Sequence, residues 1–212
     1  MPYLPNEREY RAMHVMAPVE VRSDSSQNYI VEGYATTFND PYTLWEEPGF
    51  KFQEVVDSKA FNGTDTSDTI MQFDHAGHVY ARISNGTLQV APDDHGLKVR
   101  ADLGGTEIGR QLYEEIKGGY TTKMSFGFTV DNDDKQVDET GDKQVITRTI
   151  LHVKKLYDVS AVSLPANDTT EISARQYGEG VVAEVKEEIQ RQAEREAQRE
   201  AIIARIRLMK EV

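Results

Sequence analysis

Residues 123–130 read KMSFGFTV, and large apolar side chains alternate with small or polar ones along the whole stretch. Because successive side chains of a β-strand point to opposite faces, this alternation predicts a strand that lays one face on a core. The other face carries Ser125, Gly127 and Thr129. Since Gly127 has no side chain, we expect it to leave room beside Ser125 for a substrate backbone. The stretch predicts a β structure in which Ser125 is a candidate nucleophile.

Other short runs rich in β-branched and aromatic residues, separated by Gly, Asn and Asp clusters, indicate a mainly β fold, a barrel or a sandwich. These predicted strands are 29–38, 69–73, 86–91, 97–103, 145–153 and 157–164. Residues 41–53 follow a turn signal and are expected to form a loop that carries Trp45. One helix is predicted over 106–117, where Ile108, Leu112 and Ile116 recur every four residues.

The chain divides by composition into three parts: an N-terminal arm over 1–27, a β domain over 28–178 and a charged extension over 179–212. Glu and Arg at helical spacing in the extension predict one long exposed helix. Its last 32 residues hold seven acidic and seven basic side chains, so the net charge of −12 belongs to the rest of the chain.

Composition also limits the function classes. A net charge of −12 without a basic patch argues against a nucleic-acid partner. The chain has no cysteine, so a thiol nucleophile and a thiolate metal site are excluded. No stretch approaches the roughly 20 apolar residues of a membrane span, and no export signal is recognised, so we expect a soluble protein without a membrane partner.

A serine nucleophile needs a base, and a histidine is the usual one near neutral pH. His75 and His78 follow directly after an apolar strand, where catalytic side chains commonly lie. The other three candidates are His14 in the arm, His95 in a turn and His152 near a strand end. The residues alone therefore draw attention to His75 and His78 without deciding between them.

Asp158 is a carboxylate inside an otherwise strand-like run, and burying it without a partner is costly. It could orient a histidine and stabilise its imidazolium, or it could pair with a Lys or Arg. A zinc-dependent hydrolase that uses His75, His78 and Asp158 is an alternative. It is less favoured because a strand would place the two histidines on opposite faces, and the usual His-Glu-x-x-His pattern is missing.

A series of motifs gives a more specific signal: Gly33-Tyr34-Ala35, Phe73-Asp74-His75, Asp94-His95-Gly96-Leu97, Glu115-Ile116-Lys117-Gly118-Gly119, Met124-Ser125-Phe126-Gly127-Phe128, Asp158-Val159-Ser160 and Leu164-Pro165-Ala166. In this order and wording they resemble the prohead maturation protease family of tailed bacteriophages. The similarity covers residues 28–175. Its most specific part is the Met-Ser-Phe-Gly-Phe strand, spaced in this way from an upstream histidine and a downstream Pro-Ala.

The resemblance implies a serine endopeptidase with the closed β-barrel of the herpesvirus assemblins, at least one packed helix and no metal or cofactor. By motif, Ser125 is the nucleophile, His75 the base and Asp158 the third member. The family pattern favours Glu where this chain has Asp158, which is one methylene shorter. In the herpesvirus relatives the third member is a histidine, so His78 and His152 remain fallback candidates.

The resemblance also implies partners and a location. The expected substrates are the major capsid protein, its scaffold segment and the protease itself, inside the procapsid in the host cytoplasm, and a dimer is possible. The charged extension over 179–212 would bind scaffold or be cleaved. The rival from a different class is a noncatalytic capsid-assembly or scaffold protein, suggested by the acidic body and the helical tail; in that case Ser125 would be without consequence.

Overall fold

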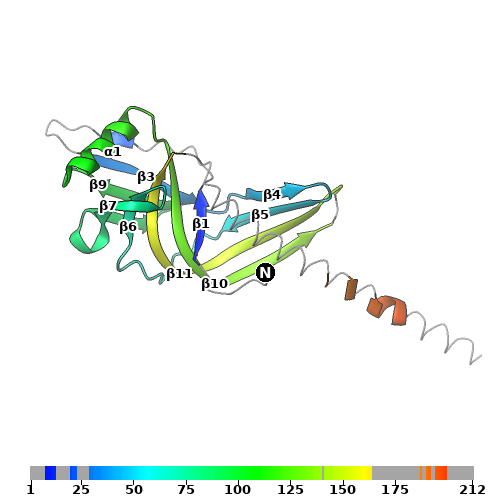
Figure 1. Cartoon of the computed structure of the whole chain (residues 1–212). Coiled ribbons are helices and arrows are strands. Elements are labelled where there is room, and N and C mark those ends of the chain that lie inside the picture. Colours follow the sequence, from blue (N-terminus) through cyan, green and yellow to red (C-terminus); the bar gives the residue numbers. More distant parts are fainter. Residues whose placement is uncertain are drawn as a thin grey trace, which may run out of the picture. The chain divides into compact units, whose positions relative to one another are not determined.

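Two β-sheets and one α-helix make up most of the described chain (Figure 1). The computed structural model describes residues 8–12, 20–22, 29–139, 141–163, 187, 190–191 and 194–199. The elements are β1 (Glu9–Ala12), β2 (Glu20–Arg22), β3 (Ile30–Thr37), β4 (Tyr42–Glu47), β5 (Phe50–Val56), β6 (Ile70–Phe73), β7 (Ala76–Arg82), η1 (Ile83–Asn85), β8 (Leu88–Pro92), β9 (Gly96–Asp102), α1 (Glu107–Lys117), β10 (Lys123–Asp138) and β11 (Gln144–Val162).

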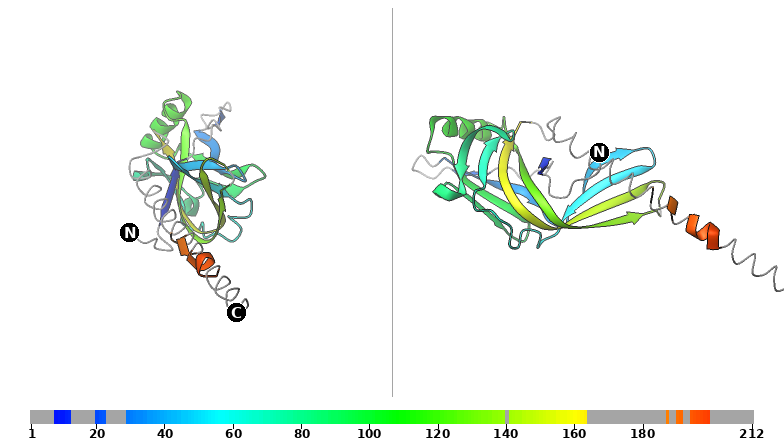
Figure 2. Two further views of the ribbon diagram at one scale, coloured as in Figure 1. Left: turned by 90° about the vertical axis from the view of Figure 1, so that its right-hand side faces the viewer. Right: turned by 60° about the horizontal axis from the view of Figure 1, so that its bottom comes forward.

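The larger sheet is organised around the long antiparallel pair β10 and β11. Its order is β1-β10-β11-β5-β4, and β6 joins β11 and then β7 beyond the end of β5. β11 therefore pairs in parallel with β5 along its first residues and with β6 along its last. Figure 2 shows both long strands curving strongly, and the register between them shifts several times from Gly127 onward. Such irregularities bend a strand pair, so the β10–β11 hairpin can pair with β5 at one end and with β6 at the other.

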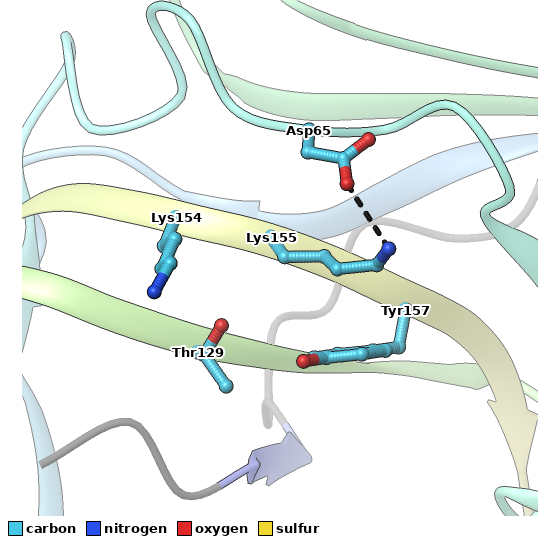
Figure 3. A pocket seen from close by; sticks show the side chains of 5 residues that line it. All are labelled: Asp65, Thr129, Lys154, Lys155 and Tyr157. Carbon is cyan, nitrogen blue, oxygen red and sulfur yellow. Dashed lines mark ion pairs between the residues drawn. The ribbon is translucent and has the colours of Figure 1, made fainter.

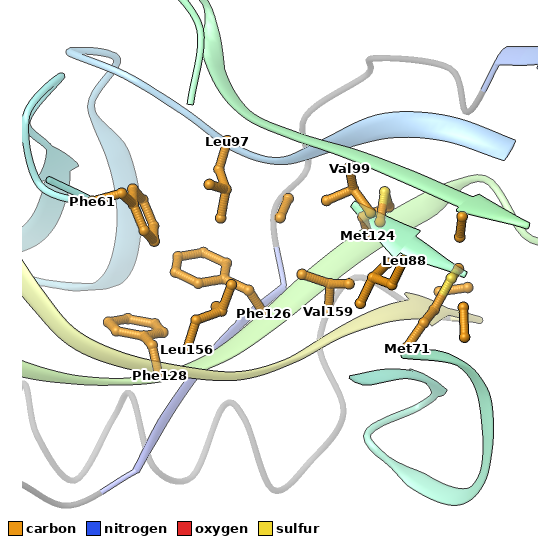
Figure 4. Packing of buried hydrophobic residues seen from close by; sticks show 14 of the residues in the cluster. Phe61, Met71, Leu88, Leu97, Val99, Met124, Phe126, Phe128, Leu156 and Val159 are labelled. Atoms are coloured by element: carbon orange, nitrogen blue, oxygen red, sulfur yellow. The ribbon is translucent and has the colours of Figure 1, made fainter. Parts of the chain in front are cut away.

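The core lies where the smaller sheet, β2-β3-β9-β8, covers the curved part of β10 and β11 (Figure 4). Phe126 and Phe128 are fully buried and their rings stack 4.4 Å apart. Met124 and Val130 lie on the same face of β10 and are also buried. This confirms the core face that the alternation over 123–130 predicts.

Helix α1 confirms the predicted helix to within one residue. Thr106 caps its N-terminus by accepting a hydrogen bond from the Gly109 N–H, and Leu112 and Ile116 are buried. At its C-terminus, the N–H of Gly118 donates to the Glu114 carbonyl and that of Gly119 to the Ile116 carbonyl. No described helix is long and apolar enough to span a membrane.

The closed β-barrel predicted from the family resemblance is wrong. Among the described strands, no pairing connects the seven-stranded sheet to the four-stranded one, so the sheets do not close. The two runs 145–153 and 157–164 were predicted as separate strands, but residues 145–153 and 157–162 belong to the single strand β11. Because no turn separates them, the strand continues into a second set of partners, and the sheet extends along the hairpin.

Residues 41–53 are not the expected loop, because β4 and β5 form an antiparallel hairpin there. Gly49 lies at its turn with a φ of 89°, a conformation that suits glycine. Phe52 is fully buried beneath the hairpin. Together with the far ends of β10 and β11, β4 and β5 form a four-stranded wing (Figure 1).

The predicted long helix over 179–212 is also wrong as far as the chain is described. The helix described there is short: its helical residues are 187, 190–191 and 194–199, and the other residues of the extension lie outside the described ones. The contacts divide the chain into two units, Leu4–Arg175 and Gln176–Val212 with Met1–Tyr3. The predicted boundaries after 27 and 178 fall outside the described residues, so the three-part organisation stays a prediction.

Candidate active site

Ser125 lies near the start of β10, between two neighbouring strands. Its Cα pairs with Ser160 of β11 on one side and with Ala12 of β1 on the other. The strand alternation turns its side chain away from the core face of β10. The residue is nevertheless fully buried, at 0% exposure, because other elements cover it.

His75 occupies a tight turn between β6 and β7. Phe73 and Ala76 pair across this turn, and its two central residues, Asp74 and His75, have φ of 48° and 56°. Two consecutive left-handed residues are typical of a type I′ hairpin turn. Residues other than glycine are uncommon in this conformation, although Asp and His adopt it more readily than most, and such strain persists where the surroundings enforce it, often at functional sites.

The end of β11 holds this turn in place through Asp74. Its carboxylate accepts hydrogen bonds from the Ser163 N–H and hydroxyl, each at 2.9 Å, and its N–H donates to the Ala161 carbonyl. His75 is therefore fixed relative to β11. Its side chain is 10% exposed and packs edge-on against the Tyr10 ring, with centroids 4.6 Å apart.

Asp158 lies on β11 directly opposite Gly127 of β10. A Cβ built on Gly127 would lie 2.3 Å from the Asp158 Oδ2 atom, so any other residue at position 127 would collide with this carboxylate. Glycine does provide space next to Ser125, as the sequence suggests. However, the Asp158 carboxylate and the Tyr10 ring fill that space, not a substrate backbone.

The structure brings Ser125, His75 and Asp158 together in one line of hydrogen bonds. The His75 Nδ1 atom lies 2.6 Å from the Asp158 Oδ1 atom, and its Nε2 atom lies 2.6 Å from the Ser125 Oγ atom. The shorter aspartate therefore reaches the histidine. We call these three residues the Ser125 cluster.

Asp158 is fully buried and is stabilised as a carboxylate. Burial alone would raise its pKa, but the hydrogen bond and charge of His75, the Ser160 hydroxyl and the Arg8 guanidinium together lower it below its ordinary value. The Ser160 hydroxyl donates to Oδ1 at 2.7 Å, and Arg8 pairs with Oδ2. The cluster thus contains a permanent negative charge next to the imidazole.

Strand β1 places a carbonyl group on the nucleophile candidate. The Ser125 hydroxyl donates to the Arg11 carbonyl at 2.7 Å, while the same oxygen lies next to the His75 Nε2 atom. A carbonyl can only accept, so the single hydroxyl hydrogen points to Arg11 and is not directed at Nε2. For His75 to accept the Ser125 proton, the hydroxyl must first turn from the Arg11 carbonyl to the Nε2 atom.

The other predicted candidates lie elsewhere. His78 is exposed on β7, and His152 pairs with Asp131 at 2.5 Å and lies 3.1 Å from the Asn62 carbonyl. His95 is exposed, and His14 lies outside the described residues. Both ring nitrogens of His75 are engaged within the Ser125 cluster, and the described residues contain no group of three side chains suited to holding a metal.

Sequence reasoning missed three residues at β1, namely Arg8, which directly precedes the strand, and Tyr10 and Arg11 within it. They belong to residues 1–27, which the composition of the sequence indicates to be an N-terminal arm. It also missed Ser160, for which a signal existed. In a strand, residues two apart share a face, so Ser160 follows directly from the position of Asp158.

Comparison with protein-family models matches residues 17–201 to the family described as caudovirus prohead serine protease. No curated protein and no solved structure gives a match. The predicted relation to the herpesvirus assemblins therefore stays without support.

Proposed function

The chain belongs to the caudovirus prohead serine protease family, and we propose that it is an endopeptidase in which Ser125 is the nucleophile, His75 the general base and Asp158 the residue that orients it. The observation that carries this proposal is the pair of 2.6 Å contacts that join Asp158 to His75 and His75 to Ser125. This is the arrangement of nucleophile, base and orienting acid that serine proteases of unrelated folds share.

The proposed reaction begins when a substrate carbonyl replaces the Arg11 carbonyl and the Ser125 hydroxyl turns to a neutral His75. The Oγ atom attacks the carbonyl carbon, and its proton passes to the Nε2 atom. The imidazolium then gives this proton to the leaving amine as the peptide C–N bond breaks. Water hydrolyses the resulting acyl-enzyme by the same steps, with His75 taking a proton from the water and returning it to Ser125.

Asp158 supports these steps in two ways. Its hydrogen bond to Nδ1 fixes the tautomer in which Nε2 is free to accept the serine proton. Its charge stabilises the imidazolium that forms during attack, and this effect is strong because the carboxylate is fully buried. The Gly118 and Gly119 N–H groups, which follow a helix, are already bonded to helix carbonyls and are thus poor candidates for an oxyanion hole.

For the substrate, we propose the major capsid protein and its scaffold segment, together with the protease chain itself. The family description supports a role in the prohead, and hence action inside the procapsid in the host cytoplasm, next to capsid proteins. We propose self-association as a dimer only as a further consequence of the family resemblance.

The proposal is tested by the intact mass of the purified chain after incubation at high concentration. Three samples are compared: the wild type, Ser125→Ala, and the wild type with a chelator. We expect the wild type to shorten with or without the chelator and Ser125→Ala to remain intact. Equal shortening of Ser125→Ala would overturn the assignment of the nucleophile. If the wild type cleaves neither itself nor an added capsid protein, the noncatalytic assembly role becomes the better reading.

A further inference from the structure

Strand β1 lies along the edge of β10 that carries the nucleophile candidate. It runs antiparallel to β10, with Arg11 opposite Phe126 and Ala12 opposite Ser125. In the described part of the sheet it pairs with no other strand. It also precedes residues 17–201, which match the protease family. An extended segment added to a sheet edge is a common way of binding peptides.

One face of β1 inserts an arginine into a buried acidic site. Arg11 is 2% exposed, and its Nε and Nη2 atoms donate to the two carboxylate oxygens of Glu54 at 2.7 and 3.0 Å. This two-point contact suits the planar guanidinium group specifically. The guanidinium also lies over the Phe128 ring, 5.6 Å from its centroid. The Arg11 guanidinium thus contacts a carboxylate and an aromatic face.

Glu54 is fully buried and lies on β5, within residues 17–201, which match the protease family and are called the protease body below. It also accepts hydrogen bonds from Tyr42 and from Arg148, at 2.5 and 2.9 Å. Burial alone would raise its pKa, but Arg11 and Arg148 lower it to about 2. Without Arg11 this carboxylate would lose two of its four contacts, so another arginine side chain could take the vacated place.

The same face of β1 contributes an acid two residues before the arginine. The Glu9 carboxylate accepts two hydrogen bonds from the buried Arg148, at 2.7 and 3.0 Å. The body therefore presents a cation to position 9 and an anion to position 11, in the order that matches the charges of β1. Glu54, Arg148, Arg11 and Glu9 are called the Glu54 cluster below.

The opposite face of β1, together with Arg8 directly before the strand, covers the Ser125 cluster. Arg8 pairs with Asp158 and lies over the rings of Tyr10 and Tyr157, 5.0 and 4.6 Å from their centroids. Tyr157 also lines a small surface pocket together with Asp65, Thr129, Lys154 and Lys155 (Figure 3). Both faces of β1 are thus engaged, and the Arg11 carbonyl between them is the group that touches Ser125.

We propose that the edge of β10 beside Ser125 is a binding site for an extended peptide with an acidic residue two positions before an arginine, that Arg148 and Glu54 recognise these two side chains, and that Glu9–Ala12 is its built-in ligand. The proposal rests on the proposed function, because it is the role of Ser125 as nucleophile that makes this edge a substrate site. In a substrate bound in the same register, the arginine carries the carbonyl that faces Ser125. While β1 is in place, it excludes such a substrate.

The test measures peptide binding in a full-length Ser125→Ala background, where cleavage does not interfere. A fluorescent peptide with the sequence of residues 6–15 is titrated with Ser125→Ala and with Ser125→Ala/Arg11→Gln, and its polarisation is followed. The tethered β1 competes with the peptide in the first protein, and the competition weakens in the second because a charge-assisted contact is lost. We expect the second protein to bind the peptide roughly tenfold more tightly.

A matched peptide with glutamine at the position of Arg11 serves as the control, and we expect it to bind roughly tenfold more weakly than the arginine peptide. Equal binding of the two peptides would overturn the role of Glu54. Equal binding by the two proteins, both with the circular dichroism of the folded chain, would overturn the role of β1 as a displaceable ligand. A strand that serves only the fold would lose stability on Arg11→Gln without any gain in peptide binding.

A second variant covers the case in which Arg11→Gln does not fold. Arg8 is 36% exposed, so Arg8→Gln weakens β1 with little effect on the core, and it should raise peptide affinity in the same direction. No change with Arg8→Gln would then count against the proposal. The binding result is independent of catalysis: a peptide that binds but is not cleaved by the Ser125 chain contradicts the proposed function and leaves this site standing.

Discussion

Two buried groups of charged and polar side chains lie on either side of β1, and they differ in how they are completed. The Ser125 cluster is built entirely from β10, β11 and the turn after β6. The Glu54 cluster takes Glu54 from β5 and Arg148 from β11, but it takes Glu9 and Arg11 from β1. The first is complete within the protease body, whereas the second is complete only when a strand is docked.

This difference fits the two proposed roles, catalysis for the Ser125 cluster and peptide recognition for the Glu54 cluster. Buried ion pairs give little net stability, because desolvation offsets the attraction, and they are costly when one partner is removed. A cluster that requires an added strand therefore favours a strand with the matching charges. The Ser125 cluster needs no such partner for the contacts that join His75 to Asp158 and to Ser125. The two clusters should consequently respond differently to substitution.

The largest expected effect comes from Ser125→Ala. It removes the proposed nucleophile, so kcat/KM for peptide cleavage should fall by a factor on the order of 10⁵–10⁶. The free energy of unfolding should change by only about 1 kcal/mol, because a buried hydroxyl with two contacts is lost. Cleavage kinetics and urea unfolding of the same preparations check both values. Retained activity would show that the cluster is structural.

Asp158→Asn should give the next largest effect, a decrease in kcat of roughly 10⁴-fold. The amide cannot accept the Nδ1–H hydrogen bond with a full charge, so it neither fixes the required tautomer nor stabilises the imidazolium. The matched control is Asp131→Asn, which alters a similar aspartate–histidine pair, with His152 at 2.5 Å, outside the Ser125 cluster. Steady-state kinetics should show the control unchanged, and a loss of activity in both variants would contradict the local role of Asp158.

Local patterns in the sequence made the three residues of the Ser125 cluster candidates, and the family resemblance selected them from the alternatives. The alternation over 123–130 separates Ser125 from the core face, His75 follows a strand end, and Asp158 is conspicuous in an apolar run. Each signal depends on side chains close in the chain. Their meeting in space depends on the pairing of β11 with both β10 and β6, for which the family motifs were the available guide.

The Glu54 cluster could not be predicted, because its strands bury charges. Prediction from periodicity assumes that inward side chains are apolar, and in β1 the inward side chains are Glu9 and Arg11. β5 likewise carries the charged Glu54 inward, and residues 131–136 of β10 are polar throughout. The charged residues are satisfied only by partners far away in the sequence. The stretches that contain them therefore resemble loops until the sheet is assembled.

Gly127→Ala tests whether the packing between the two strands is essential to the Ser125 cluster. The added Cβ would lie 2.3 Å from the Asp158 Oδ2 atom, so the carboxylate must move away from His75. We expect about 1–3 kcal/mol of destabilisation, and a decrease in activity of roughly 10²-fold from the misplaced group. Gly105→Ala is the control, since a Cβ there meets no atom within 4 Å. Thermal unfolding and peptide cleavage of both variants decide the point.

Acid should weaken the Glu54 cluster over a defined range of pH. The pKa of Glu54 is lowered from 4.5 to about 2 in the folded chain, so its contribution is fully present above pH 4.5 and is lost as the pH falls towards 2. The loss should amount to roughly 3 kcal/mol in the free energy of unfolding. Glu54→Gln should be less stable at neutral pH, but its stability should fall less steeply in this range. Urea unfolding of both proteins at several pH values measures this. If the free energy of unfolding falls equally steeply with pH in the two proteins, Glu54 does not stabilise the fold as a buried carboxylate.

The smallest effect is expected from an exposed ion pair whose charged atoms are about as close as those in the two clusters but which is not buried. Lys155 lies 3.0 Å from Asp65 at the edge of the pocket in Figure 3, and the two side chains are 35% and 47% exposed. Solvent screens such a pair and its long side chains lose freedom in forming it, so Lys155→Gln should leave the unfolding midpoint and the cleavage rate unchanged. Thermal unfolding at low and high salt measures this. A clearly lower unfolding midpoint of Lys155→Gln would mean that a short contact between opposite charges stabilises this protein even when it is exposed. Burial would then no longer explain why the Glu54 cluster requires β1.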